Sequence, residues 1–443
     1  MSSTPAIDFH SDLAQDLFVP PVPQTVEETG LHETLIEQLL LKNLYFSGEL
    51  LGRDLAGALG LKFSLIDNIL EFLKRTRLAD VKRSSGLGNV SAVFALSEAG
   101  RGRAKEYLDI NQYAGFAPVP IAQYADAVRE QSAPDGWLNK QTLGEAFSHM
   151  VFNEDVLARV GPAVNSGKSF LIYGQPGNGK TYLAEALSKL ERPYIYVPHA
   201  IECQGVIIQM FDPIYHRLVD ESCHTDGSVA LEPVYDARWA RCRRPFIVTG
   251  GELTLEMLDL SYNPSAKIYD APFQLKANNG IYLIDDFGRQ KVTPAELLNR
   301  WIIPMDRRVD YLTFHTGGKM VTPFETFLIF STNLHPDRLG DEAFLRRIQY
   351  KMHLVGPTEA EFIEIFDQFC ISQSIFCPPS MLRRFIDAHY TKTGKRFRRC
   401  HPRDVITHAI DLIRFESLPL ELTDEVLDRA FDSCFLEAGD IKE

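Results

Sequence analysis

The run from Gly174 to Thr181 constrains this chain more than any other feature of its sequence. It reads Gly-Gln-Pro-Gly-Asn-Gly-Lys-Thr and matches the phosphate-loop pattern G-x-x-x-x-G-K-[ST] at every fixed position. An apolar run over 169–173 precedes it and a helical pattern over 182–187 follows it. A chance glycine-rich turn is the alternative, but it does not account for this strand–loop–helix setting. The pattern predicts an α/β domain that binds a nucleoside triphosphate.

Each part of this loop has an expected role. The glycines let backbone N–H groups turn toward a polyphosphate, and the helix that follows adds the positive end of its dipole. Lys180 is expected to reach the β- and γ-phosphates of ATP, and the Thr181 hydroxyl is expected to bind Mg²⁺. The predicted phosphate-binding residues are Gly174, Gln175, Pro176, Gly177, Asn178, Gly179, Lys180 and Thr181.

Composition limits the class of protein. The chain has 443 residues, of which 45% are hydrophobic and 24% charged, which is typical of globular proteins with several domains. It contains no apolar run of about 18 residues and no basic start followed by an apolar block, so neither a membrane span nor a secretory signal is expected. The seven cysteines form no C-x-x-C pair. Reduced thiols and a cytoplasmic location are expected, and the adjacent pairs 223–224 and 400–401 are interpreted as ordinary residues rather than metal ligands.

Changes in composition and pattern divide the chain into five segments. The expected order is a flexible N-terminal segment over 1–30, a winged-helix domain over 31–108, a linker over 109–140, an α/β core over 141–355 and a helical lid over 356–443.

The second segment shows three helical patterns, two β-prone runs over 78–82 and 90–96, and a closing helix over 97–108. Ser64 is expected to cap the third helix. This order is that of a winged helix-turn-helix, and the phrase from Phe94 to Arg101 resembles the junction of wing and helix in many bacterial winged-helix domains.

Two functions remain open for this segment. It holds 11 Lys and Arg against 9 Asp and Glu, in a chain whose net charge is −13. That net charge excludes a protein that coats nucleic acid with its whole surface. A basic cluster at the end of the third helix and in the first wing strand favours contacts with DNA phosphates, whereas a solvated face on a protein-docking module explains the same residues. The cluster consists of Lys74, Arg75, Arg77, Lys82 and Arg83.

A second strand pattern lies about a hundred residues beyond the loop, over 280–288, and ends in two acids. Because strand ends deliver side chains to the ligand crevice of an α/β sheet, both acids are expected near the phosphates. Asp285 is expected to hold Mg²⁺ through water, and Asp286 to orient or deprotonate the attacking water.

Further polar residues follow other elements. Asn333 ends a buried strand and is expected to contact the γ-phosphate or the attacking water. Arg346 and Arg347 follow a short helix, and Arg403 lies in the first turn of a later helix, where the dipole disfavours a cation that has no anionic partner. The alternative interpretations are that Asn333 caps the next segment and that the arginines are surface or structural cations.

Together, the phosphate loop, the double acid, the strand-end Asn, the arginine pair and the late Pro-Arg resemble the landmarks of AAA+ ATPases over about 141–415. The whole chain is similar to bacterial AAA+ proteins with an N-terminal winged helix. The resemblance implies that Asn333 is sensor 1, that Arg403 is sensor 2, and that Arg346 or Arg347 is an arginine finger acting on ATP in a neighbouring subunit. A homo-oligomer, expected to be a hexamer, follows. Asp286 departs from the Glu of most of the family, which implies slow hydrolysis.

Two segments are interpreted as elaborations that contact a client. Tyr311–Thr322 is expected to form a β-hairpin resembling the pre-sensor-1 insertion of some AAA+ proteins, and 201–280 is a long link between core strands. The predicted function is ATP hydrolysis coupled to remodelling of a protein or protein–DNA partner. The alternatives are an ATP-switched DNA-binding regulator with little turnover and, less favoured, a kinase.

Overall fold

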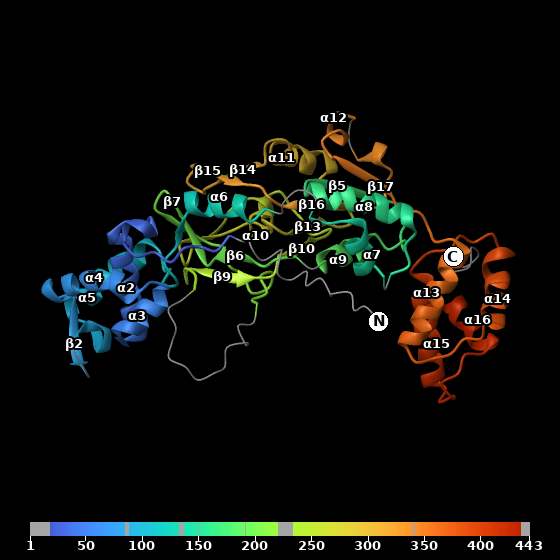
Figure 1. The fold of residues 1–443 in the computed structure, drawn as a ribbon, viewed down its shortest axis with the longest axis horizontal. Coiled ribbons are helices and arrows are strands. Elements are labelled where there is room, and N and C mark those ends of the chain that lie inside the picture. The colour runs from blue at the N-terminus through green and yellow to red at the C-terminus, as the bar shows by residue number, and fades with distance from the viewer. Residues whose placement is uncertain are drawn as a thin grey trace, which may run out of the picture. The chain divides into compact units, whose positions relative to one another are not determined.

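The computed structural model describes residues 18–84, 88–132, 137–148, 150–190, 192–219, 234–339 and 342–435. The chain divides into two compact units that interleave along the sequence. Unit 1 comprises Met1–Pro134, Glu191–Leu283 and Lys291–Leu328, and unit 2 comprises Asp135–Leu190, Ile284–Gln290 and Ile329–Glu443. Figure 1 labels the elements along the chain.

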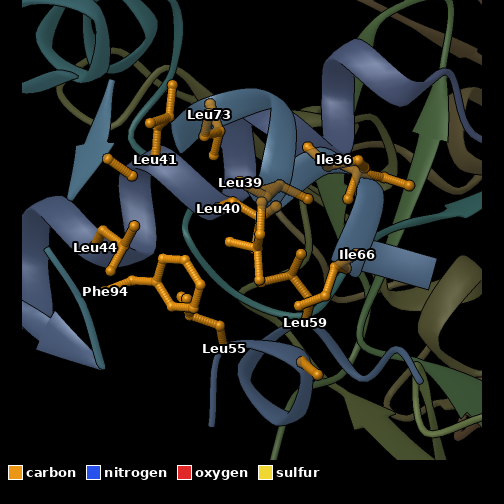
Figure 2. Packing of buried hydrophobic residues seen from close by; sticks show 14 of the residues in the cluster. Ile36, Leu39, Leu40, Leu41, Leu44, Leu55, Leu59, Ile66, Leu73 and Phe94 are labelled. Carbon is orange, nitrogen blue, oxygen red and sulfur yellow. The ribbon is translucent and has the colours of Figure 1, made fainter. Parts of the chain in front are cut away.

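The N-terminal part of unit 1 is a helical cluster with a small antiparallel sheet in the order β1-β3-β2. Its elements are η1 (Glu27–Thr29), α2 (Glu33–Ser47), β1 (Glu49–Leu51), α3 (Gly52–Leu59), α4 (Phe63–Arg75), β2 (Ala79–Ser84), η2 (Asn89–Ser91), β3 (Ala92–Leu96) and α5 (Glu98–Ile110). Leucine and isoleucine side chains of the helices close over Phe94 of β3 in one apolar core (Figure 2). Burial of this core stabilises the cluster.

The predicted cap of α4 is wrong by two residues. The helix begins at Phe63, and its N-cap is Lys62, which is extended and has no side-chain cap. The carbonyl of Lys62 accepts a hydrogen bond from the N–H of Leu65 at 3.0 Å. The first turn therefore closes before Ser64 can cap it, because the apolar positions that must face the core set where the helix starts.

The rest of unit 1 is mainly β-structure around a second apolar core. One sheet has the order β11-β12-β8-β7-β4, and β6–β9 and β14–β15 form antiparallel pairs. The elements are β4 (Val119–Pro120), α6 (Ile121–Glu130), β6 (Ile195–Pro198), β7 (Ala200–Cys203), β8 (Val206–Gln209), β9 (Trp239–Cys242), η3 (Glu256–Leu258), β11 (Ser261–Asn263), β12 (Ile268–Asp270), α10 (Phe273–Lys276), α11 (Pro294–Arg307), β14 (Val309–Thr313) and β15 (Lys319–Pro323).

A five-stranded sheet in the order β10-β13-β16-β5-β17 carries the predicted strand-end residues. Its strands are β10 (Phe246–Thr249), β13 (Ile281–Ile284), β16 (Phe327–Thr332), β5 (Ser169–Tyr173) and β17 (Tyr350–His353). β5 and β17 are parallel, and every residue of β13 and β16 is buried. Strands buried on both faces are typical of a parallel sheet flanked by helices, and the chain is accordingly a mixed α/β protein.

The helices of unit 2 begin at residues whose side chains satisfy their first N–H groups. Asn153 caps α8, and Thr358 and Glu361 form a capping box on α13. The unit contains α7 (Lys140–Ala146), α8 (Glu154–Ser166), α9 (Lys180–Ser188), η4 (Pro336–Arg338), α12 (Glu342–Leu345), α13 (Glu359–Ser372), α14 (Pro379–Ile386), η5 (Asp387–Thr391), α15 (His401–Phe415) and α16 (Asp424–Cys434). The last four α-helices share an apolar core of their own.

Some of the predictions made from the sequence concern residues that the structure does not describe or that lie next to them. Residues 1–17, the wing tip over 85–87, the pair Cys223–His224 and the last residues from 436 lie outside the described residues. The second part of the expected flexible lead-in is anchored within unit 1, since Phe18 packs edge-on against Trp239 and the carbonyl of Pro20 accepts from the N–H of Asp236 at 3.0 Å. The five-segment division stays a prediction.

Candidate functional site

The phosphate-loop run leaves β5 and enters α9 at Lys180, as the strand–loop–helix pattern requires. Gly177 and Gly179 have φ values of 80° and 85°, in the left-handed region that side chains disfavour. A Cβ on Gly177 would also lie 2.5 Å from Sγ of Cys400, so this position has neither the conformational nor the steric room for a side chain. The loop thus has the backbone shape that its glycines predict.

Lys180 points back into the loop. Its Nζ donates to the carbonyls of Gly174 and Gln175 at 3.0 and 3.2 Å and to Oδ1 of Asn333 at 2.6 Å. The side chain is only 7% exposed. Burial lowers the pKa of Lys180, and the charges of Asp285 and Asp286 oppose that shift. All three N–H groups of the ammonium are therefore engaged, and each by an uncharged oxygen.

Thr181 and Asp285 meet directly. Oγ1 of Thr181 donates to Oδ2 of Asp285 at 2.8 Å, which joins the first turn of α9 to the carboxyl end of β13. A hydroxyl and a carboxylate are the oxygen ligands that hard divalent cations prefer. The pair therefore fits a Mg²⁺ ion held together with phosphate oxygens.

The second acid is held by a neighbouring amide. Asn333 donates from Nδ2 to Oδ1 of Asp286 at 2.9 Å while its Oδ1 accepts from Lys180. Asp286 has a φ of 47°, a left-handed conformation that Asp tolerates better than most residues. One amide thus connects the loop cation to the acid that is predicted to act on water.

Gln290 braces the turn that carries both acids. Its Nε2 donates to the carbonyl of Asp285 at 2.9 Å and to that of Asp286 at 3.3 Å, and its Oε1 accepts from the N–H of Gly288 at 2.8 Å. These bonds fix the main chain on either side of the left-handed residue. Gln290 was not identified from the sequence. An amide side chain four residues after Asp286 could have indicated a residue that bonds to the main chain of the acid turn.

Sheet order explains why these side chains converge. β16, which ends next to Asn333, lies between β5, which leads into the loop, and β13, which ends at the acids. The N–H of Gly174 donates to the carbonyl of Thr332, and the N–H of Phe287 to that of Ser331. Side chains that follow adjacent strand ends meet at one edge of the sheet.

The loop before α15 lies against the phosphate loop. The N–H of Cys400 donates to the carbonyl of Gly177 at 3.0 Å. Cβ positions built on Gly177 and Gly179 lie 3.5 Å from Cδ of Arg398 and of Arg399, respectively. Two arginines of the C-terminal helical region therefore adjoin the loop. Sequence reasoning missed them, although the run Arg396-Phe397-Arg398-Arg399 directly precedes the Cys-His-Pro-Arg phrase.

These two arginines have different surroundings. The guanidinium of Arg399 donates to the carbonyl of Val151, pairs with Glu361 at 3.3 Å and lies over the ring of Phe152. The side chain of Arg398 forms no ion pair with any residue that the structure describes. Of the two, Arg398 keeps its charge uncompensated beside the loop.

The other predicted arginines are placed differently. Arg403, in the first turn of α15, pairs with the adjacent Asp404 at 2.9 Å and is 65% exposed. That carboxylate is the anionic partner that its position at a helix N-terminus requires. Arg346 pairs with Glu342 at 2.8 Å and is 75% exposed, and Arg347 is half-buried. The structure brings none of the three into contact with the phosphate loop within the described ranges.

The expected hairpin over 311–322 is present in unit 1 as β14 and β15. Tyr311 lies opposite Val321, and both side chains are exposed. His315 at its turn stacks on Tyr262 of β11 with ring centroids 3.8 Å apart. The hairpin is therefore anchored at its tip and presents an apolar pair on its outer face.

Comparisons with known proteins assign no function. Residues 358–433, which span α13 to α16, match a family model described as a domain of unknown function (DUF8689). No curated protein matches the chain. The matched segment is too short a part of the chain to place the whole protein in a family.

Two solved structures show a distant likeness. NtrX from Brucella abortus is 12% identical, with a TM-score of 0.41, over 68% of this chain and 59% of that one. A mutant of RuvB from Thermotoga maritima is 12% identical, with a TM-score of 0.34, over 68% of this chain and 73% of that one. This chain thus spans less than two thirds of the NtrX chain, and likeness at this level does not establish a common fold.

Within the described ranges, no helix has both the length and the hydrophobicity needed to span a membrane.

Proposed function

We propose that this chain is an AAA+-type ATPase that binds Mg-ATP at the phosphate loop and hydrolyses it. The observation that carries the proposal is the hydrogen bonding of Lys180, whose ammonium is held by two carbonyls and an amide beside the Thr181–Asp285 pair. Because these hydrogen-bond partners are uncharged, phosphate oxygens can replace them without breaking an ion pair. The sheet order, with the Asn strand between the loop strand and the acid strand, supports the same conclusion.

The loop and its surroundings fit a nucleoside triphosphate. Left-handed glycines that lead into the N-terminus of a helix, as at α9, are the features that let backbone N–H groups bind a polyphosphate. Thr181 and Asp285 would hold Mg²⁺, which neutralises charge on the phosphates when bound. Arg398, rather than Arg403, is the better candidate for a contact from the lid, because only Arg398 adjoins the loop and lacks a carboxylate partner among the described residues.

The roles of the chain's own residues follow. Phosphate oxygens would replace the neutral acceptors of Lys180, which frees Asn333. Asp286 would accept a proton from the attacking water as a bond forms from the water oxygen to the γ-phosphorus and the bond to the bridging oxygen of the ADP leaving group breaks. Because Asp286 is one methylene shorter than Glu and is held by Asn333, slow turnover is expected.

Oligomer formation belongs to the same proposal. Arg346 or Arg347 would act on ATP bound by a neighbouring subunit of a homo-oligomer, which we infer to be a hexamer. The 75% exposure of Arg346 supports this role, and among the described residues its guanidinium pairs with Glu342 alone. Sedimentation with and without an ATP analogue tests the assembly.

We further infer that residues 31–108 form a winged-helix module, since α2-β1-α3-α4-β2-β3-α5 is the element order of that fold. In this proposal, hydrolysis moves the lid against the core and remodels a bound macromolecule in the cytoplasm.

Two measurements test the proposal on the full chain and on an Asp286→Asn variant. They are calorimetric titration with Mg-ATP and the steady-state rate of ATP hydrolysis. The variant keeps an acceptor for Asn333 but has no carboxylate to accept a proton. We expect it to bind Mg-ATP like the parent chain and to lose hydrolysis by about a hundredfold.

The possible outcomes separate the candidate functions. If the parent chain and the Asp286→Asn variant bind Mg-ATP equally well and hydrolyse it at the same very low rate, the ATP-switched regulator would be favoured. A folded chain with no affinity for Mg-ATP would reject the proposal as a whole.

A further inference from the structure

Three extended segments of unit 1 lie side by side around β9. On one side β9 pairs antiparallel with β6 (Figure 1). On its other side Cys242 lies opposite Leu218, and the N–H of Arg243 donates to the carbonyl of Arg217 at 2.9 Å. Residues 217–219 therefore continue the pair as a third antiparallel segment. We call these three segments the arginine ribbon.

The two faces of the arginine ribbon differ in character. Cys242 lies opposite Ile195 of β6, and both belong to a buried apolar cluster on one face. Because side chains alternate along a strand, Arg241 and Arg243 point to the other face. The pairing of Leu218 with Cys242 places Arg217 directly opposite Arg243 on that same face. Both of these arginines are exposed.

This arginine pair has an uncompensated charge. Neither Arg217 nor Arg243 forms an ion pair with any residue that the structure describes. Like charges directly opposite each other destabilise a sheet. A shortage of acids is not the reason, because the chain has 59 Asp and Glu against 46 Lys and Arg. Other exposed arginines do pair with carboxylates, among them Arg103, Arg129, Arg384 and Arg429. An anion bound between the two guanidinium groups would relieve their repulsion.

A stacked pair of planar groups lies on the same face. The guanidinium of Arg241 lies over the ring of Tyr194 at 3.5 Å from its centroid, and both residues are half-buried. Guanidinium planes and aromatic rings are the groups on which unpaired nucleobases stack. The next arginine, Arg244, instead donates to three main-chain carbonyls. Trp239, at the other end of β9, is buried and packs edge-on against Phe18. The open part of the face is therefore the end that carries the arginines.

We propose that the arginine ribbon binds single-stranded nucleic acid, with Arg217 and Arg243 against phosphates. A base stacks over the pair formed by Arg241 and Tyr194. A single strand offers phosphates together with bases that are free to stack, so it suits both groups at once. An acidic peptide offers carboxylates but no base, and a duplex keeps its bases stacked on one another. The proposal does not depend on ATP hydrolysis, and it gives the segment 201–280 a partner of defined chemistry.

The test measures binding of a labelled single strand of about 16 nucleotides to the full chain by fluorescence anisotropy, without ATP or Mg²⁺ and at several salt concentrations. Arg217→Ala with Arg243→Ala removes two phosphate contacts. The affinity is expected to fall roughly tenfold, and the slope of log affinity against log salt to decrease in magnitude by about 1.4. DNA and RNA strands of one sequence are expected to lose affinity equally, because phosphate contacts do not involve the 2′-hydroxyl.

The matched control is Arg384→Ala with Arg429→Ala, which removes two exposed arginines that pair with carboxylates. Its salt slope and affinity are expected to equal those of the parent chain. The proposal would be overturned if both double variants changed the slope equally. It would also be overturned if the Arg217→Ala, Arg243→Ala variant lost affinity for a duplex or for polyglutamate but not for the single strand.

Two further variants sharpen the test. Arg241→Lys keeps the charge but removes the plane, so affinity is expected to fall roughly fivefold with an unchanged salt slope. An unchanged affinity would reject the stacking of a base on this residue. If circular dichroism shows that the double alanine variant does not fold, Arg217→Gln alone is measured, with a decrease in slope of about 0.7 expected. An unchanged slope in that variant would contradict the proposal.

Discussion

Lys180 of the phosphate loop and three cations of the N-terminal region have opposite kinds of partner. Lys180 is buried in the loop and donates only to uncharged oxygens. The three cations of the N-terminal region instead have carboxylate partners: Lys74 pairs with Glu71 at 2.8 Å, Lys82 with Asp80 at 3.8 Å and Arg83 with Glu49 at 3.7 Å.

This difference bears on which of the two regions is better suited to bind an anion. Carbonyl and amide dipoles orient an ammonium without cancelling its charge, whereas a carboxylate cancels most of the field that a distant phosphate would feel. A count of basic residues therefore says little about phosphate binding until their partners are known.

Removal of the loop cation should have the largest effect. Lys180→Ala is expected to lower the rate of ATP hydrolysis by about a hundredfold or more and to weaken Mg-ATP binding. Among the described residues, no other ammonium donates to Asn333 beside the phosphate loop and could take its place. Calorimetry and steady-state assays measure both quantities. Lys189→Ala, at the exposed end of α9, is the matched control and should behave like the parent chain. Unchanged affinity in the Lys180→Ala variant would break the comparison.

A carboxylate in place of Asn333 should give Lys180 a charged partner, as Lys74, Lys82 and Arg83 have. Asn333→Asp places a carboxylate within reach of the ammonium, and Mg-ATP affinity is expected to fall by about tenfold or more. Asn333→Ala removes the amide without adding charge, so affinity should change by less than about threefold while hydrolysis falls by roughly tenfold. Equal affinities in the two variants would show that neutrality of the partner does not matter.

Two arginines of the C-terminal helical region also differ in whether a carboxylate pairs with them, and a smaller effect on Mg-ATP binding is expected. Arg398 adjoins the loop and has no carboxylate partner among the described residues, whereas Arg403 pairs with Asp404. Arg398→Ala is expected to weaken Mg-ATP binding by roughly fivefold, and Arg403→Ala by less than about twofold, in calorimetric titrations. The reverse order would restore Arg403 as the residue that senses the nucleotide.

A further comparison concerns the backbone that positions these neutral oxygens, and its effect is measured on the free energy of unfolding. Gly177 and Gly205 share a φ of 80°, but only Gly177 has an atom near its Cβ position, Sγ of Cys400 at 2.5 Å. Gly205→Ala is expected to lower the free energy of unfolding by about 1 kcal/mol through backbone strain alone. Gly177→Ala should lower it by about 1 kcal/mol more and also weaken nucleotide binding. Urea unfolding measures the free energies, and equal losses would rule out the Cys400 contact.

The loop conformation and the buried strands could be predicted from the sequence, because backbone preferences and apolar patterns act over a few neighbouring residues. The glycine spacing of 174–181 fixed a loop shape, since left-handed φ values favour glycine wherever they occur in a fold. Continuous apolar runs likewise marked β5, β13 and β16 as buried strands. The start of α4 was missed because packing against the core, not the local cap, decided it.

Partnership between distant residues required the tertiary structure. Sequence alone determined that a phosphate loop, two acids and an Asn follow strands in this chain, because periodicity and glycine positions are local. Only the sheet order brought Asn333 between Lys180 and Asp286, and only packing set Arg398 beside the loop and Glu49 beside Arg83. The physical reason is that a charge acts through its nearest neighbours in space, and those neighbours lie tens to hundreds of residues away along the chain.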